Sequence, residues 1–281
     1  MHRAFGWTLA LAVLSTSAAL GQGTITDPPA TFVRGATPWD TSPAANFTGV
    51  SATLSQDHLF ETGWWFRVAG DTQETAFSVP DSQDYTGSSS TIHWNDVAGR
   101  GLFAATENTS LYDTTSIFGF ASGYVATMLS IENLSSQDPL ELEIFHLADF
   151  DLAGPGSDSA AWRQYTPYSM IELTDPSGNV AYYLSPHPWT GFLVRPWSTA
   201  TGVAALLSDA AVTDFDNSGL PFGPGDFTGG WQYSLTLPPG GSDFVGVYLM
   251  VNSNAYCFNP VGVFCDGFEG EELFFWSSSI P

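Results

Sequence analysis

The sequence predicts an all-β protein, built as an antiparallel β-sandwich with little helix. Short β-prone segments recur along the chain, and several alternate apolar with polar side chains, which is the period of a half-buried strand. The 28 glycines and 18 prolines fall mostly between these segments, where turns are expected. No strand-like segment alternates with a long helical pattern, so a parallel α/β sheet is disfavoured.

The N-terminal segment 1–21 is predicted to be a signal peptide. It begins with a short basic stretch containing Arg3, continues in the apolar run 7–14, and ends in small residues. That run is too short to cross a bilayer comfortably, and no later segment approaches about 18 apolar residues, so no membrane-spanning helix is expected. The next segment, 22–46, is rich in Pro, Thr and Ala, and we expect it to be extended and partly loop.

Segment 139–149 is the most strand-like part of the chain. Its first half alternates apolar residues with glutamate, and its second half is apolar on both faces, so it is expected to enter the core. Segment 123–133 alternates in the same way, and the polar link between the two predicts a hairpin. His146 lies on the apolar face, where a hydrogen-bonded core histidine is expected. The strand ends at Asp149 and Asp151 before a glycine-rich turn, which makes this end the most site-like feature.

The remaining segments complete a sandwich of about ten to twelve strands, enlarged if all of them join it. A second hairpin is predicted where Asp-Pro-Ser-Gly at 175–178 forms a turn between 169–174 and 180–184. Three prolines exclude 185–197 as a central strand, and 202–212 fits a short surface helix or a strand. The other strand-like segments of this domain, which spans 47–255, are 57–69, 75–79, 91–95, 102–106, 231–237 and 244–251.

The C-terminal segment 256–281 differs in character and forms a separate tail. It contains the two cysteines of the chain, Cys257 and Cys265. In an exported protein such a close, even pair predicts a disulfide. The tail is therefore expected to carry one short cross-linked loop.

Two sequence likenesses point to bacterial export. Phe264-Cys-Asp-Gly-Phe-Glu-Gly270 and Trp276-Ser-Ser-Ser279 resemble the short tail that closes many otherwise unrelated exported proteins of Gram-negative environmental bacteria. The order of Asn133, Asp149-Phe-Asp151 and Gly225-Asp226 resembles a group of exported bacterial β-sandwich proteins of no assigned function. These resemblances imply an exported bacterial protein, and neither implies an activity.

The charge balance excludes several functions. The chain has 6 Lys+Arg, all of them arginine, against 29 Asp+Glu, for a net charge of −23. Without lysine, Schiff-base chemistry, a P-loop lysine and a Ser–Lys dyad are excluded. Nucleic acid and anionic membrane surfaces are unfavourable partners, because binding to either needs cationic side chains. An acidic surface instead favours divalent cations such as calcium.

Two acidic loops are candidate calcium sites. Both have carboxylates at positions one and three and a glycine at six, and the first also has a serine at position five, like the first half of a calcium loop; the second has alanine there. In the first loop the ligands would be Asp214, Asp216, Ser218 and Asp226. In the second they would be Asp149, Asp151 and Asp158. Neither completes the EF-hand pattern, and acidic turn residues often only accept backbone N–H groups, so both interpretations stay open.

Carbohydrate recognition is a further candidate. Trp189 and Trp197 lie in the proline-rich segment expected at the surface, where flat aromatic rings can stack on sugars. Packing in the core is the competing explanation for both. Asp149 and Asp151 are also nominal candidates for the acid and base of a glycosidase, although 29 acidic residues bring some pairs together by chance.

No coherent catalytic set is visible, since the chain lacks a Gly-x-Ser-x-Gly elbow, a zinc-binding histidine pair and a phosphate loop. We therefore expect an exported, non-catalytic binding or structural β-sandwich at the cell envelope or outside the cell. Its expected partner is an extracellular glycan or a cell-surface component. The alternatives are a glycan-active hydrolase or lyase that uses Asp149 and Asp151, and a surface assembly component that uses an exposed sheet edge.

Overall fold

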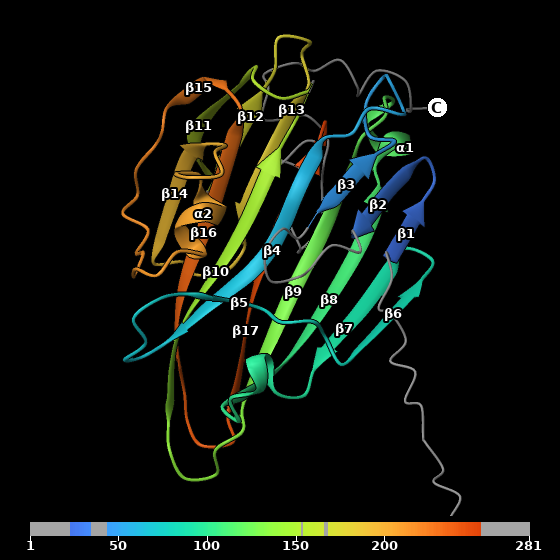
Figure 1. Ribbon diagram of the computed structural model, residues 1–281. Helices are drawn as coiled ribbons and strands as arrows, with labels where there is room; N and C mark the ends of the chain where they lie inside the picture. The colour runs from blue at the N-terminus through green and yellow to red at the C-terminus, as the bar shows by residue number, and fades with distance from the viewer. Residues whose placement is uncertain (1–22, 35–43, 153, 166–167, 254–281) are drawn as a thin grey trace, which may run out of the picture.

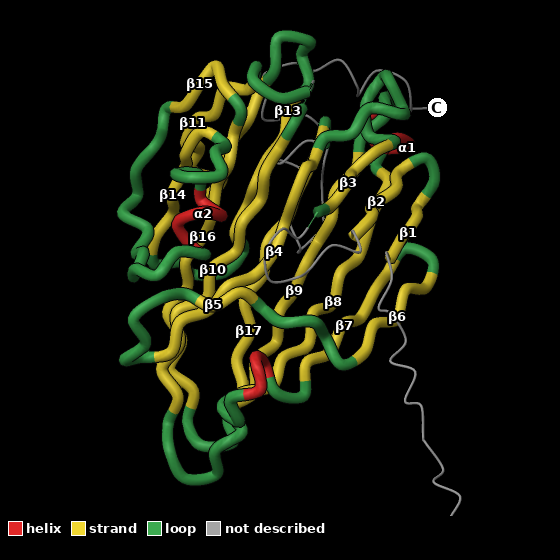
Figure 2. The backbone as a smooth tube through the Cα atoms, viewed as in Figure 1, coloured by secondary structure: helices red, strands yellow, loops and turns green. Residues whose placement is uncertain are grey.

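The computed structural model describes residues 23–34, 44–152, 154–165 and 168–253. Within them the protein is nearly all β, as predicted: seventeen strands form three sheets in which neighbouring strands run antiparallel (Figures 1 and 2). There are more strands than the ten to twelve expected, because several are too short to show an alternating pattern.

The largest sheet has nine strands and forms one layer of the sandwich. In spatial order they are β15 (Phe222–Gly225), β11 (Asp158–Tyr165), β12 (Tyr168–Thr174), β13 (Val180–Ser185), β17 (Ser242–Val251), β9 (Gly123–Asn133), β8 (Phe103–Asp113), β7 (Ser89–Trp94) and β6 (Ser82–Thr86). The 3-10 turn Val97–Gly99 and helix α1 (Thr115–Phe118) lie in its connections.

The second layer is shared by two smaller sheets. The five-stranded sheet has the order β14 (Gly191–Pro196), β16 (Phe227–Leu237), β10 (Leu140–Phe150), β4 (Leu59–Val68) and β5 (Thr75–Ala76). The three-stranded sheet comprises β1 (Gly23–Asp27), β2 (Ala30–Arg34) and β3 (Ala45–Thr48). The three-stranded sheet lies beside β4 and over β8 (Figure 1). An antiparallel bridge from Ala44 to Glu61 of β4 joins it to the five-stranded sheet.

The main core fills the space between the layers. It is rich in aromatic side chains from both sheets, among them Phe66, Trp94, Phe103, Tyr183 and Trp231. A smaller core lies on the outer face of the five-stranded sheet, where helix α2 (Val203–Leu207) covers Phe145 and Leu147 of β10. This helix falls in the segment whose apolar spacing suggested one. Strand β10 is therefore covered on both faces, as its continuous apolar second half predicted.

The N-terminal segment contributes more than an extended loop. Its described part forms β1, β2 and the start of β3, and alternate side chains such as Ile25, Phe32 and Phe47 are buried in the main core. The strands are four or five residues long, so each shows too few alternations to stand out in the sequence.

The predicted hairpin between 123–133 and 139–149 is wrong. Both segments are strands, but β9 belongs to the nine-stranded sheet and β10 to the five-stranded sheet. The chain crosses between layers at Asn133, whose side-chain amide donates to the carbonyl oxygens of Asp138, Leu237 and Pro238 at 2.9–3.3 Å. The apolar face of β9 and the inner face of β10 are both buried in the main core, and this puts the two strands in opposite layers rather than side by side.

Other local predictions are confirmed. Strands β12 and β13 pair across the turn at 175–178, and β7 pairs with β8. The proline-rich segment yields only an edge strand, β14, in keeping with the missing N–H groups of proline. A bilayer-spanning helix is not found among the described residues, whose helices are all short. The expected signal peptide, Cys257, Cys265 and the tail lie outside the described residues.

Candidate functional site

The candidate site lies where β10 ends. Asp149 occupies the outer face of the five-stranded sheet, opposite Thr228 of β16 and Glu61 of β4. The register with β4 shifts between Asp149 and Phe150, and such irregularities re-aim side chains at strand ends. The next carboxylate, Asp151, follows directly, and its backbone N–H donates to the carbonyl oxygen of His58 at 3.2 Å.

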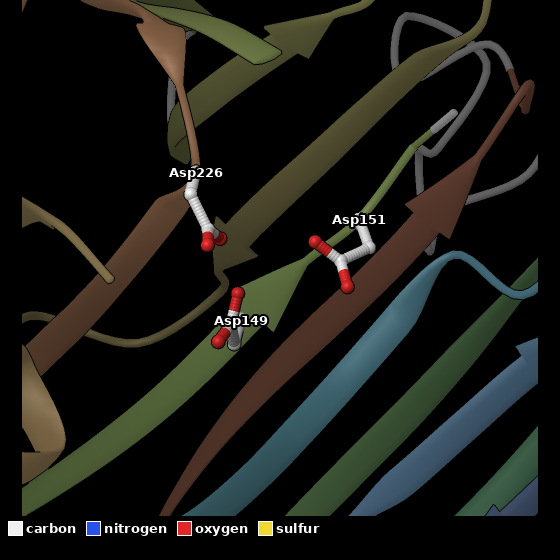
Figure 3. A group of neighbouring side chains, drawn as sticks. All are labelled: Asp149, Asp151 and Asp226. Atoms are coloured by element: carbon white, nitrogen blue, oxygen red, sulfur yellow. The ribbon is translucent and has the colours of Figure 1, made fainter. Parts of the chain in front are cut away.

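A third carboxylate arrives from a distant part of the chain. Asp226 sits between β15 and β16, and the pairing of β15 with β11 places Gly225 opposite Asp158. One carboxylate oxygen from each of Asp149, Asp151 and Asp226 lies within 4.8 Å of the others. Figure 3 shows the three side chains converging, two from the end of β10 and one from the link between β15 and β16.

The carboxylates are poorly compensated. The side chain of Asp149 is 1% exposed, and neither of its oxygens has a hydrogen-bond partner among the described residues. One oxygen of Asp151 is also buried without a partner. Buried polar atoms are nearly always hydrogen-bonded in folded proteins. A fully buried carboxyl group without a donor therefore calls for a ligand or a proton.

The electrostatics of the cluster agree with its geometry. Burial, followed by the charges of Asp151 and Glu61, raises the pKa of Asp149 to about 9. Burial and the charge of Asp226 raise the pKa of Asp151 to about 6. Burial also raises the pKa of Asp226, and burial with the charge of Asp151 raises that of Asp158 to about 7, although the Leu152 amide opposes the shift. The folded chain alone thus disfavours full ionisation of the cluster.

The cluster forms part of a cavity of about 200 Å³. Its other lining residues are Phe60, Pro155 and Trp197. Phe60 is 47% exposed and Trp197 40% exposed, and the two rings meet edge to face with centroids 6.3 Å apart. The backbone N–H of Trp197 donates to the carbonyl oxygen of Asp226 at 2.8 Å, so the ring is tied to the loop that carries a cluster carboxylate.

A second hollow, of about 380 Å³, adjoins the first. It shares Phe60 and Trp197, and it continues over Glu61, Ser198 and α2 as far as Ser208. Phe60 and Trp197 therefore line both hollows, the one that holds the aspartate cluster and the one that runs over Glu61 and α2.

The structure does not assemble the first predicted calcium loop. Asp226 joins the β10 cluster instead, while Asp214 pairs with Arg67 and accepts from Gln232. The side chain of Asp216 is exposed, and that of Ser218 is partly so. The geometric reason is Arg67, which draws Asp214 towards β4 and Glu74. Of the second loop, Asp149 and Asp151 belong to the cluster, and the charge of the nearby Asp158 raises the pKa of Asp149.

The two candidate tryptophans have different places. Trp197 lines the acidic cavity. Trp189 packs against Trp162, Phe192 and Trp231 at the edge of the main core, which is the competing explanation that the sequence left open. The two do not form one surface patch.

His146 is a core residue, as its place on the apolar face predicted. It is buried, with Nδ1 2.6 Å from the Tyr183 hydroxyl and Nε2 3.0 Å from Thr62 Oγ1. Burial holds the pKa of His146 well below its usual value, so the ring is neutral and fully bonded. It faces away from the acidic cluster, because it alternates with Leu147 and Asp149 along β10.

Sequence reasoning missed Phe60 and did not connect Trp197 with Asp226. Phe60 lies within the strand-like segment 57–69, to which the sequence assigned no functional role. The only available signal was its position beside Glu61, an acidic residue inside that segment.

Comparisons with known proteins do not assign a family. No protein-family model matches the chain, and no curated protein sequence matches it significantly. Among solved structures, the chain is similar to a human-microbiome protein assigned as a kojibiose phosphorylase, with TM-score 0.39 and 7% identity, covering 79% of this chain and 30% of that one. It is also similar to an amine oxidase of Aspergillus nidulans, with TM-score 0.35 and 8% identity, covering 92% and 56% respectively. The chain spans less than two thirds of either protein, and likenesses at this level identify no function.

Proposed function

We propose that this chain is an exported, non-catalytic β-sandwich protein that binds an extracellular glycan. The observation that carries the proposal is a cavity lined both by two exposed aromatic residues, Phe60 and Trp197, and by three carboxylates. Export rests on the expected signal peptide at 1–21 and on the resemblance of the tail to those of exported bacterial proteins. The site of action is then the cell envelope or the space outside the cell.

The chemistry of the cavity suits a sugar. The apolar C–H face of a sugar ring can pack against an aromatic ring. The hydroxyl groups of the sugar can at the same time donate hydrogen bonds to carboxylates, which are strong acceptors. Phe60 and Trp197 lie at right angles, with an interplanar angle of 87°, so one ring can stack while the other forms a wall. The adjoining hollow of about 380 Å³ leaves room for further sugar units beyond the acidic cavity.

The number of carboxylates favours binding over hydrolysis. A glycosidase uses two carboxyl groups that flank the scissile bond, separated by roughly 5–5.5 Å in a retaining enzyme and roughly 6.5–9.5 Å in an inverting one. Here, one oxygen atom from each of three carboxylates lies within 4.8 Å of the others. Three carboxylates grouped in this way bind a single ion more readily than they flank a glycosidic bond.

The test is binding of the purified protein to a panel of polysaccharides, by glycan array and isothermal titration. We expect retention of at least one glycan without release of reducing ends, and loss of retention in Trp197→Ala. Phe120→Ala is the matched control, since Phe120 is another exposed aromatic residue, 55% exposed and outside the cavity. Failure to retain any glycan, or equal retention by Trp197→Ala, would refute the proposal.

A glycan-active hydrolase is the second candidate, and one observation favours it. The environments of Asp149 and Asp151 push their pKa values apart, to about 9 and about 6, which is the pattern of a general acid beside a base or nucleophile. Under this hypothesis the same glycan panel yields products, and turnover disappears in Asp149→Asn and Asp151→Asn. Retention without products excludes it for the glycans tested.

A further inference from the structure

The three aspartates of the cluster have no positively charged partner among the residues that the structure describes. None of the ion pairs in the described part of the structure includes Asp149, Asp151 or Asp226. The sequence has no lysine and only 6 arginines against 29 acidic residues. Three carboxylates held close together in a buried site repel one another, so the cluster is compensated either by protons or by a cation from solution.

An independent observation shows where such a cation would sit. Asp149 is 1% exposed, and both of its oxygens lack a hydrogen-bond donor among the described residues. Figure 3 shows its carboxylate directed towards that of Asp226, with the Asp151 carboxylate turned towards the same space. The buried, unpartnered group therefore points into the gap between the other two instead of into the apolar core.

We propose that Asp149, Asp151 and Asp226 form a calcium site. Calcium binds oxygen ligands at about 2.3–2.6 Å, so two oxygens on opposite sides of the ion lie about 4.8 Å apart. The three carboxylates have oxygens within 4.8 Å of one another, which is within the spread of oxygens in a single calcium coordination sphere. They supply three to six oxygen ligands, according to how many bind through both oxygens.

The donor set selects among metals. All three ligands are carboxylates, and the group includes no histidine or cysteine, so hard cations are favoured over zinc or copper. Magnesium prefers a strict octahedron at about 2.0–2.1 Å and keeps much of its water. Calcium accepts six to eight ligands in flexible geometry, which suits three side chains that come from a strand end, a turn and a loop between strands.

The calcium site would make the proposed glycan binding calcium-dependent. This consequence rests on the proposed function. Six to eight coordination positions exceed what three carboxylates fill unless every one binds through both oxygens. The remaining positions face the cavity beneath Phe60 and Trp197, where water or a pair of sugar hydroxyls completes the sphere. Glycan binding is then calcium-dependent, because the ion both bridges to the hydroxyls and neutralises the carboxylates.

The test begins with calcium alone. The purified full chain, stripped with chelator, is titrated with CaCl₂ by calorimetry and followed by melting temperature. We expect one bound ion and a higher melting temperature. Asp226→Asn and Asp151→Asn are expected to weaken binding by at least the roughly 10- to 100-fold lost when a group supporting a metal ligand is removed. Both residues are partly exposed, so these variants are expected to fold.

Asp216→Asn is the matched control, because Asp216 is exposed and belongs to the other acidic loop. Its calcium affinity is expected to equal that of the wild type. Three results overturn the proposal: no heat and no shift in melting temperature, loss of binding in Asp216→Asn but not in Asp226→Asn, or tighter binding of Mg²⁺ than of Ca²⁺.

Glycan retention with calcium and with chelator separates this inference from the proposed function. Retention in calcium that disappears with chelator supports both. Equal retention in both conditions overturns the calcium dependence and leaves the glycan proposal standing. Calcium binding without retention of any glycan supports the ion site and refutes the glycan proposal.

Discussion

Replacing Asp149 with asparagine is expected to stabilise the calcium-free protein, and increasingly so as the pH rises. In the unfolded chain, Asp149 releases its proton near pH 3.8, whereas in the folded state burial and neighbouring carboxylates raise its pKa to about 9. Between these values only the folded state keeps the proton, so rising pH favours unfolding. Asparagine is close in shape to the protonated acid but does not titrate, so the variant escapes this loss.

The size of the effect follows from the pKa. Each pH unit between the two pKa values is worth about 1.4 kcal/mol. The difference between variant and wild type should be near zero at pH 4 and on the order of 4 kcal/mol at pH 7. This figure is an upper bound, because the neighbouring carboxylates titrate together with Asp149.

The assay is urea unfolding followed by tryptophan fluorescence, in chelator, at pH 4, 5.5, 7 and 8.5. Asp216→Asn serves as control, and its difference from wild type should stay small and flat, because Asp216 is exposed. With saturating calcium the wild type should be the more stable of the two, because it then binds an ion that the Asp149→Asn variant binds poorly. The reasoning fails if the difference in free energy of unfolding between Asp149→Asn and the wild type does not change with pH, or if the variant becomes less stable than the wild type as pH rises. Either result would mean that the folded protein stabilises the ionised Asp149 carboxylate.

Three further predictions concern the scaffold. Glu107→Ala should lower the free energy of unfolding by about 3–5 kcal/mol, because it leaves the buried Arg34, now bonded to both Glu107 oxygens at 2.7–2.8 Å, without that partner; a loss below about 1 kcal/mol in urea unfolding would contradict this. Gly219→Ala should cost at least about 1–3 kcal/mol by the same measurement, since φ is +97° and a Cβ would lie 1.9 Å from the Val194 carbonyl oxygen; an unchanged unfolding midpoint is the opposing result. The Asp149→Asn variant should lose stability as the pH falls below about 6.5, because the unfolded chain takes up a proton that the buried His146 refuses; adding His146→Gln should flatten this slope, and an unaltered slope would assign it to other groups.

Much of the local structure can be predicted from the sequence. The alternation in 123–133 and 139–149, the turn at 175–178 and the prolines of 185–197 each act over a few residues, and the structure has the elements they indicate. The hairpin error shows the limit. The short link after Asn133 is compatible with pairing in one sheet or with crossing between two, and only the burial of both apolar faces decides between them.

The sequence by itself determined that the chain would fold as an antiparallel β-sandwich, and that a strand running into the core would end at Asp149 and Asp151. Both follow from the alternation of apolar and polar side chains, which depends only on residues close together in the sequence. Tertiary structure alone decided that Asp226 completes the cluster, that Asp214 turns away to Arg67, and that Trp197 rather than Trp189 stands over the cavity. The pairings of β15 with β11 and of β16 with β10 bring Asp226 to the end of β10, and the pairing of β14 with β16 brings Trp197 there. Such contacts join residues tens of positions apart, and they depend on which faces are buried together, a quantity that no local pattern encodes.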